Sequence, residues 1–140
     1  MRAAVLLLVI AGCYQPRGGT CTIDDDCAGG EICAHNHQCL PPEEVHAVTI
    51  HWTVGGAPAS ATTCAGISQL EVGYRIGFDE ATRTLFAPVP CSAGSFPNDK
   101  WPIAYDTALI FADGAGSSTS QTGWIAPDPV ASVTIDIQHP

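Results

Sequence analysis

The chain has 140 residues, of which 46% are hydrophobic and 14% charged. Fourteen acidic residues against five basic ones give a net charge of −9, which excludes the clustered lysines and arginines that nucleic-acid binding requires. The length suffices for one ordinary domain and a small accessory one.

The first twelve residues have the three parts of a secretory signal peptide. Arg2 gives a basic start, residues 3–10 are eight consecutive apolar residues, and the small pair at 11–12 forms a cleavage zone. A transmembrane helix needs about 20 apolar residues, so this run is too short to span a bilayer. We therefore expect residues 1–12 to be an export signal.

The apolar run ends at Ile10, which Ala11, Gly12 and Cys13 follow directly. These residues resemble the bacterial lipobox, in which cleavage precedes the cysteine and its sulfur carries a diacylglyceryl group. The resemblance implies that Cys13 is lipidated and that the lipid is the contact with the membrane, because anionic head groups repel an acidic chain. Tyr14 stands where this family has aspartate for inner-membrane retention, so the resemblance implies the outer membrane or cell surface. The alternative is an ordinary cleaved signal peptide with Cys13 oxidised to a partner.

The cysteine count favours the same division. The chain has seven cysteines, and lipidation of Cys13 leaves six, which can pair completely in an oxidising compartment. Residues 13–20, the lipidated tether, contain Gly, Pro and polar residues typical of a flexible linker.

Residues 21–40 form a cysteine-rich module with five residues between neighbouring cysteines. Its only large aliphatic residues are Ile23 and Ile32, so disulfides must replace a hydrophobic core. Spacing alone leaves all three pairings of four cysteines open. The C-x5-C-x5-C-x5-C pattern resembles the amino-terminal module of Dickkopf proteins and modules of exported myxobacterial proteins. That resemblance implies crossed bridges, Cys21 to Cys33 and Cys27 to Cys39.

Two groups in this module could suggest a metal. His35 and His37 lie near the cysteines, but zinc sites favour closer cysteine spacing and reduced thiolates, so we interpret both as solvated loop residues. Residues 24–26 are three aspartates without the rest of a calcium-loop pattern, which favours an exposed acidic turn. We expect no metal site.

Residues 41–45, with two prolines, are the expected linker, and residues 46–140 the expected β-sandwich domain. Apolar and polar residues alternate at residues 46–54, where Val48, Ile50, Trp52 and Val54 share one face. In the second strand the shared face would be Leu70, Val72, Tyr74, Ile76 and Phe78. This second strand is expected at 69–78. Further strands are expected at 82–89, 103–113 and 130–137, and a loop at 114–123.

Five or six strands, separated by turn residues and without a convincing helix, predict an all-β fold, an antiparallel β-sandwich. Cys64 and Cys91 lie at strand ends, so we predict a bridge between them; two unpaired buried thiols are the alternative. The segments VTIHWTVGGAPASATTC and FAPVPCSAG resemble β-sandwich domains of myxobacterial lipoproteins related to transthyretin-like or immunoglobulin-like carrier domains. The stretch KWPIAY departs from that pattern, and the resemblance implies a fold without a known chemistry.

The sequence contains no motif for nucleophilic, metal-dependent or nucleotide-dependent catalysis. A pairing of His51 with Glu71 or Asp136 would be conjecture. We therefore expect no catalytic residues and no cofactor.

Tryptophans are the candidates for binding. Trp52 follows the apolar face of its strand and is expected in the core. Trp101 and Trp124 lie at loop or strand-end positions, where they could bind a ligand or cap the sandwich. We expect a non-catalytic envelope protein that binds an envelope protein or polysaccharide. The alternatives are a structural spacer without a ligand and, less favoured, a small hydrolase or metal-binding protein.

Overall fold

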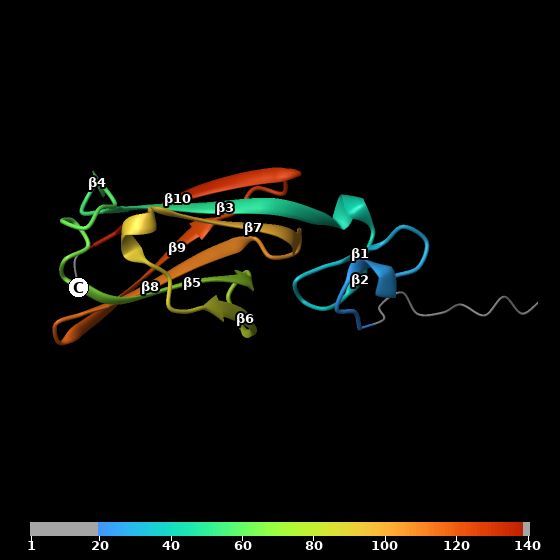
Figure 1. The fold of residues 1–140 in the computed structure, drawn as a ribbon, viewed down its shortest axis with the longest axis horizontal. Coiled ribbons are helices and arrows are strands. Elements are labelled where there is room, and N and C mark those ends of the chain that lie inside the picture. Colours follow the sequence, from blue (N-terminus) through green and yellow to red (C-terminus); the bar gives the residue numbers. More distant parts are fainter. Residues whose placement is uncertain (1–19, 139–140) are drawn as a thin grey trace, which may run out of the picture.

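The computed structural model describes residues 20–138. The expected signal peptide, Cys13 and all of the tether before Thr20 lie outside these residues. Within the described part the fold is all-β, and its helical segments are the single 3-10 turns η1 (Asp24–Asp26), η2 (Pro42–Glu44) and η3 (Cys91–Ala93). The short cysteine-rich region is followed by a β-sandwich (Figure 1).

The sandwich consists of two sheets packed face to face (Figure 1). In sheet one the strands are β3 (Val45–Val54), β4 (Ala57–Pro58), β7 (Ser95–Pro102) and β10 (Val130–Ile137). In sheet two the order is β6 (Asp79–Phe86), β5 (Ile67–Ile76), β8 (Thr107–Gly114) and β9 (Ser117–Trp124). The pairings are antiparallel, as predicted, except that β10 runs parallel to β3.

The alternation in β3 produces the sheet-one side of the core. Val48, Ile50, Trp52 and Val54 are at most 2% exposed, and full burial of such a side chain contributes about 1.5–3 kcal/mol. The indole N–H of Trp52 donates to the carbonyl of Cys91 over 2.7 Å, so the tryptophan is buried with its polar atom satisfied.

In β5 the prediction holds for the first half of the strand and is wrong for the second. Leu70, Val72 and Tyr74 are buried, but Ile76 is 37% and Phe78 92% exposed. The pairing with β6 shifts register between Tyr74 and Ile76, which breaks the alternation. Gly77, with φ +51°, then turns the chain, so Phe78 lies in the turn rather than on the strand face.

The loop expected at residues 114–123 is instead mostly β9, which pairs with β8 over its whole length. This strand lacks an apolar stripe because small polar residues face solvent on one side. On the other side, a Cβ on Gly123 would lie 2.6 Å from a methyl group of Val133, so only glycine fits there.

β7 was not predicted, because Pro97 and Pro102 interrupt its pattern. Among the described strands β7 pairs with β3 alone, so it is an edge strand. Proline is tolerated there because its missing N–H is not needed for pairing on the open side.

The cysteine-rich region contains η1 and the two-residue strands β1 (Ile32–Cys33) and β2 (Cys39–Leu40). Its bridges are Cys21–Cys33 and Cys27–Cys39, the crossed pairing that the resemblance implied. The third bridge joins Cys64 to Cys91, as predicted from their positions. The expected linker, residues 41–45, contains η2 and the first residue of β3.

Candidate binding surface

Trp101 is not a ligand-binding residue, because the structure buries it to 1% exposure. Its ring lies 4.3 Å from that of Tyr74 and 5.2 Å from those of Tyr105 and His35, measured between centroids. It therefore belongs to an aromatic cluster at the end of the core, where the cysteine-rich region meets the sandwich. The capping role was the correct alternative.

Trp124 is 67% exposed and lies at the end of β9. It pairs with Thr107, whose neighbour Ala108 is buried in the core, so Trp124 points away from sheet one. The next residue, Ile125, is 1% exposed, and its backbone N–H donates to the carbonyl of Asp106 over 2.7 Å. The tryptophan is thus held on a rigid support while its ring remains accessible.

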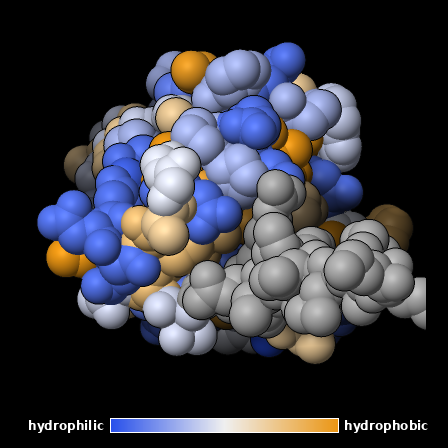
Figure 2. Space-filling model, turned by 90° about the vertical axis from the view of Figure 1, so that its right-hand side faces the viewer, coloured by the Kyte–Doolittle hydropathy of each residue, from blue (hydrophilic) through white to orange (hydrophobic). Residues whose placement is uncertain are grey.

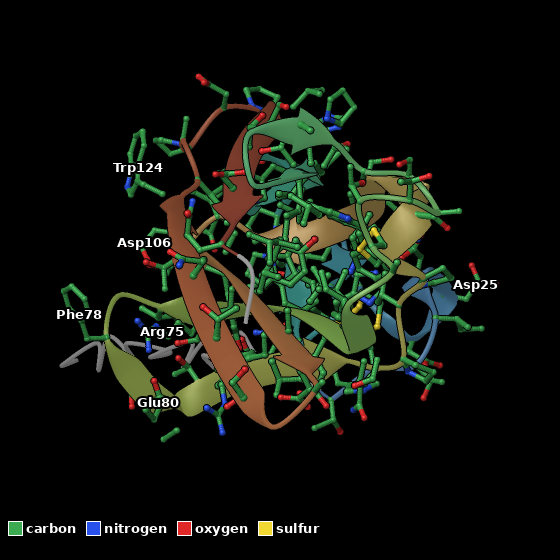
Figure 3. The ribbon with its side chains drawn as sticks, turned by 90° about the vertical axis from the view of Figure 1, so that its left-hand side faces the viewer. Asp25, Arg75, Phe78, Glu80, Asp106 and Trp124 are labelled. Carbon is green, nitrogen blue, oxygen red and sulfur yellow. A yellow bond between two sulfur atoms is a disulfide. The ribbon has the colours of Figure 1, made fainter. Side chains whose placement is uncertain are left out.

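Phe78 is the second exposed aromatic residue on this side, with 92% of its surface accessible. The guanidinium carbon of Arg75 lies 5.5 Å from the ring centroid, and Arg75 also forms an ion pair with Glu80. The N–H of Gly77 donates to Oδ1 of Asp106 over 2.7 Å, which ties the turn to sheet two. Phe78 and Trp124 project on the same side of the molecule, with Asp106 between them and Arg75 next to Phe78 (Figure 3).

We use the term outer face for the surface of sheet two that is turned away from sheet one. Strand alternation and register place on it residues Glu71, Gly73 and Arg75 of β5, Leu85 of β6, Thr107, Leu109, Phe111 and Asp113 of β8, and Ser118, Ser120, Thr122 and Trp124 of β9.

A hollow of about 370 Å³ lies on this face, near the low end of the range of about 300–1,000 Å³ for small-molecule sites. Its lining residues are Glu71, Arg83, Leu85, Phe111, Asp113, Ser118, Thr119 and Ser120. Arg83 lies over the ring of Phe111 at 5.6 Å and forms a 2.8 Å ion pair with Glu80. Phe111 is four residues from Thr107, the partner of Trp124, so about 13 Å of strand separates the hollow from the tryptophan.

A second hollow, of about 660 Å³, lies between the cysteine-rich region and the sandwich. Here the ammonium of Lys100 lies 2.7 Å from Oδ2 of Asp24, and Cys33 N–H donates to Oδ1 of Asp24. The hydrogen bond from Lys100, and to a smaller extent the one from the Cys33 N–H, hold the pKa of the Asp24 carboxyl below its usual value. Asp24 in turn raises the pKa of Lys100. Ion pairs therefore occupy much of the polar lining. The described residues visible at this end of the molecule are mainly hydrophilic (Figure 2).

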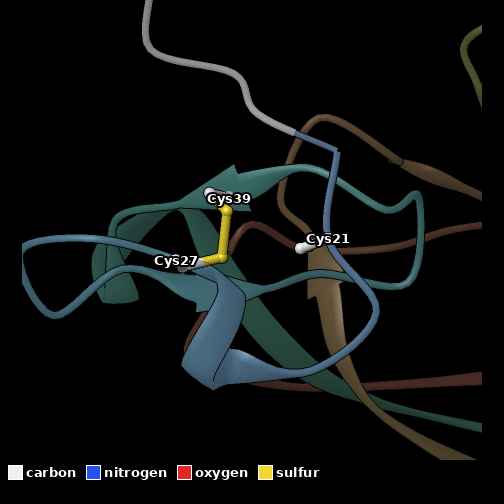
Figure 4. Close-up of side chains that lie close together, drawn as sticks. All are labelled: Cys21, Cys27 and Cys39. Carbon is white, nitrogen blue, oxygen red and sulfur yellow. A yellow bond between two sulfur atoms is a disulfide. The ribbon is translucent and has the colours of Figure 1, made fainter.

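The clustered sulfurs of the cysteine-rich region do not form a metal site. The Sγ atoms of Cys21, Cys27 and Cys39 lie within 4.8 Å of one another. Figure 4 shows these three side chains close together. All three belong to disulfides, so none offers the thiolate that a metal requires. The imidazole of His37 contacts the carbonyl of Cys21 at 3.1 Å, and that of His35 lies 3.6 Å from the Asp99 carboxylate.

The structure does not bring His51 and Glu71 together. His51 is exposed on β3 of sheet one, and Glu71 lies on the outer face of sheet two, so the two side chains are on opposite sides of the sandwich. Phe78 was the binding candidate that sequence reasoning missed, because its alternation with buried residues gave no signal of the register shift.

Neither models of protein families nor curated proteins gave a match to this chain. Within residues 20–138 we find no helix of the length and hydrophobicity needed to span a bilayer.

Proposed function

We propose that this protein is an exported, lipid-anchored component of the bacterial cell envelope that binds another envelope molecule through the outer face of sheet two, without catalysis. The anchor is proposed on the lipobox-like residues 10–13, and the outer membrane or cell surface on Tyr14. The other six cysteines are all paired in three disulfides, which supports an oxidising compartment.

The observation that carries the binding role is the rigid exposure of Trp124 on the same face as a polar hollow, about 13 Å along the strand from it. An exposed indole adds nothing to the core, yet its strand is fixed by the buried Ile125 and by the hydrogen bond to Asp106. Aromatic side chains that are fixed before binding lose little conformational entropy on contact, so they are effective anchors for a partner.

Binding is tested with the protein extracted from membranes in mild detergent and incubated with purified envelope fragments. We expect it to cosediment with the fragments, and we expect Trp124→Ala to reduce its affinity about tenfold. Val130→Ala is the matched control, because Val130 is 77% exposed on sheet one. Equal binding by wild type and Trp124→Ala, or no binding at all, would reject the proposed surface.

Anchoring is tested separately by mass spectrometry of the amino-terminal peptide. We expect a peptide that starts at Cys13 and carries the mass of a diacylglyceryl group. A Cys13→Ser variant should lack that mass and leave the membrane fraction. A wild-type peptide that starts at Met1 without lipid would overturn the assignment to the envelope.

A further inference from the structure

The charges of the hollow are not balanced. Its one cation is Arg83, which pairs with Glu80, and the neighbouring Arg75 pairs with the same glutamate. Within the described part of the chain, neither Glu71 nor Asp113 takes part in an ion pair. Oε1 of Glu71 accepts a hydrogen bond from the side-chain amide of Gln69 over 2.9 Å. Oε2 of Glu71 and the carboxylate of Asp113 offer hydrogen-bond acceptors to a ligand, and both carboxylates repel an anionic one.

The rest of the surface is rich in hydroxyl groups. β9 places Ser118, Ser120 and Thr122 in line with Trp124, and the whole strand carries no charged residue. Because alternate residues of a strand share one face, these hydroxyls form a row that ends at the indole ring.

This composition differs from that of a protein-binding site. The centres of protein–protein interfaces are depleted in Asp, Glu and Ser, whereas here Glu71, Asp113, Ser118 and Ser120 line the hollow. A sugar chain has the complementary chemistry, since its rings present apolar C–H faces and its edges present hydroxyl groups. An indole can cover the former, and carboxylates and hydroxyls can bind the latter.

We infer that the ligand of the outer face is an uncharged polysaccharide, bound along β8 and β9 from Trp124 to the hollow around Phe111; this inference rests on the proposed binding function. One sugar ring stacks on Trp124. Others follow the row of hydroxyls, and sugar hydroxyls donate to Glu71 and Asp113 in the hollow. The approximately 13 Å between the two points requires an oligosaccharide rather than a monosaccharide.

The experiment titrates the detergent-extracted protein with probes of defined chemistry and follows tryptophan fluorescence and heat of binding. The probes are oligosaccharides of a neutral α-glucan, a neutral β-glucan and a polyuronate, together with glucose. We expect at least one neutral oligosaccharide to bind, with glucose much weaker and the polyuronate not bound. Trp124→Ala should weaken that binding about tenfold.

One matched pair of variants and one double variant test the polar contacts. Ser120→Ala should weaken neutral binding several-fold, whereas Ser132→Ala, an exposed serine on β10 of sheet one, should leave it unchanged. The double substitution Glu71→Gln and Asp113→Asn should reduce discrimination against the polyuronate, because it removes the repelling charges.

The failure of this inference is distinguishable from that of the proposed function. If envelope fragments bind in a Trp124-dependent manner but lose that binding on protease treatment, and no neutral oligosaccharide binds, the partner is a protein and the inference is wrong. If the polyuronate binds in preference to neutral glucans, the charge argument is wrong. If the fragments do not bind, both proposals fail.

Discussion

Asp106 holds the backbone of Gly77 in place: the N–H of Gly77 donates to Oδ1 of Asp106 over 2.7 Å. The hydroxyl of Thr107 donates to the same oxygen over 2.9 Å. The carbonyl of Asp106 in turn accepts the N–H of Ile125. A single residue therefore supports both the turn that carries Phe78 and the strand end that carries Trp124.

Replacement of Asp106 by Ala should loosen the Phe78 turn. Loss of two partly buried hydrogen bonds is expected to lower the free energy of unfolding by about 1–3 kcal/mol and to speed hydrogen exchange at the Gly77 amide. Thr107→Val is the control, since it removes one hydroxyl bond and keeps the bond to Gly77. Unchanged exchange at Gly77 in the Asp106→Ala protein would contradict this role.

Gly73 should not tolerate a side chain, because the chain of β6 lies against it. A Cβ at this position would collide with the backbone carbonyl of Thr84 and with the side chain of Leu85. We expect Gly73→Ala to cost about 1–3 kcal/mol of stability, since the strand must move or Leu85 must leave its rotamer.

The control for this prediction is Gly66→Ala. A Cβ on Gly66 would meet nothing within 4 Å, and its φ is not in the left-handed region. Thermal denaturation of the two variants should therefore separate them by several degrees for a domain of this size. Equal melting temperatures would show that β6 can shift without cost.

The sequence predicted the parts of the fold that are governed by apolar alternation. β3 and β10 were found because each buries one complete face. β9 and β7 were missed because an edge strand needs only one paired side, so it can consist of Ser, Thr and Gly or contain proline. Trp124 was recognised as a candidate, but the hollow was not, since Glu71, Asp113 and Ser120 come from three strands whose register the sequence does not specify.

Removal of one bridge should unfold the cysteine-rich region and leave the sandwich folded. The buried cluster of that region consists of Cys21, Cys33 and Cys39, with Cys27 packed against it. A double Cys21→Ala and Cys33→Ala variant should lose about 3 kcal/mol of stability in this region by the loop-entropy model. Limited proteolysis with mass mapping should then give cuts confined to residues 21–40.

The Cys64→Ala and Cys91→Ala double variant is the comparison. Its bridge spans 27 residues, so the same model assigns it about 3.5 kcal/mol. This variant loses stability in the sandwich rather than in the cysteine-rich region, and the sandwich retains its core of Val, Ile and Trp side chains. We expect a lower melting temperature without selective cuts at residues 21–40. Cuts in the sandwich of the first variant would show that the two parts unfold together.

His46 should make the protein less stable in mild acid. It is 3% exposed; its Nδ1 lies 3.2 Å from the carbonyl of Asp128, and its Nε2 has no partner. Burial lowers the pKa of the imidazole below its usual value of about 6.5. The unfolded chain therefore takes up the proton at a higher pH than the native chain. The free energy of unfolding is highest above pH 6.5, falls as the pH decreases from 6.5 towards the lower native pKa, and falls no further below that pKa.

Urea denaturation at a series of pH values measures this effect. Between pH 6.5 and 5 the free energy of unfolding should fall by up to about 1.4 kcal/mol per pH unit, the limit for one proton. His46→Asn should lose most of that slope, because its amide can still donate to Asp128 but does not titrate. His51→Asn should retain the slope, since His51 is exposed. The lowered pKa values of Asp24 and Asp26 act only below about pH 4, outside this window. An equal slope in wild type and His46→Asn would show that another group is responsible.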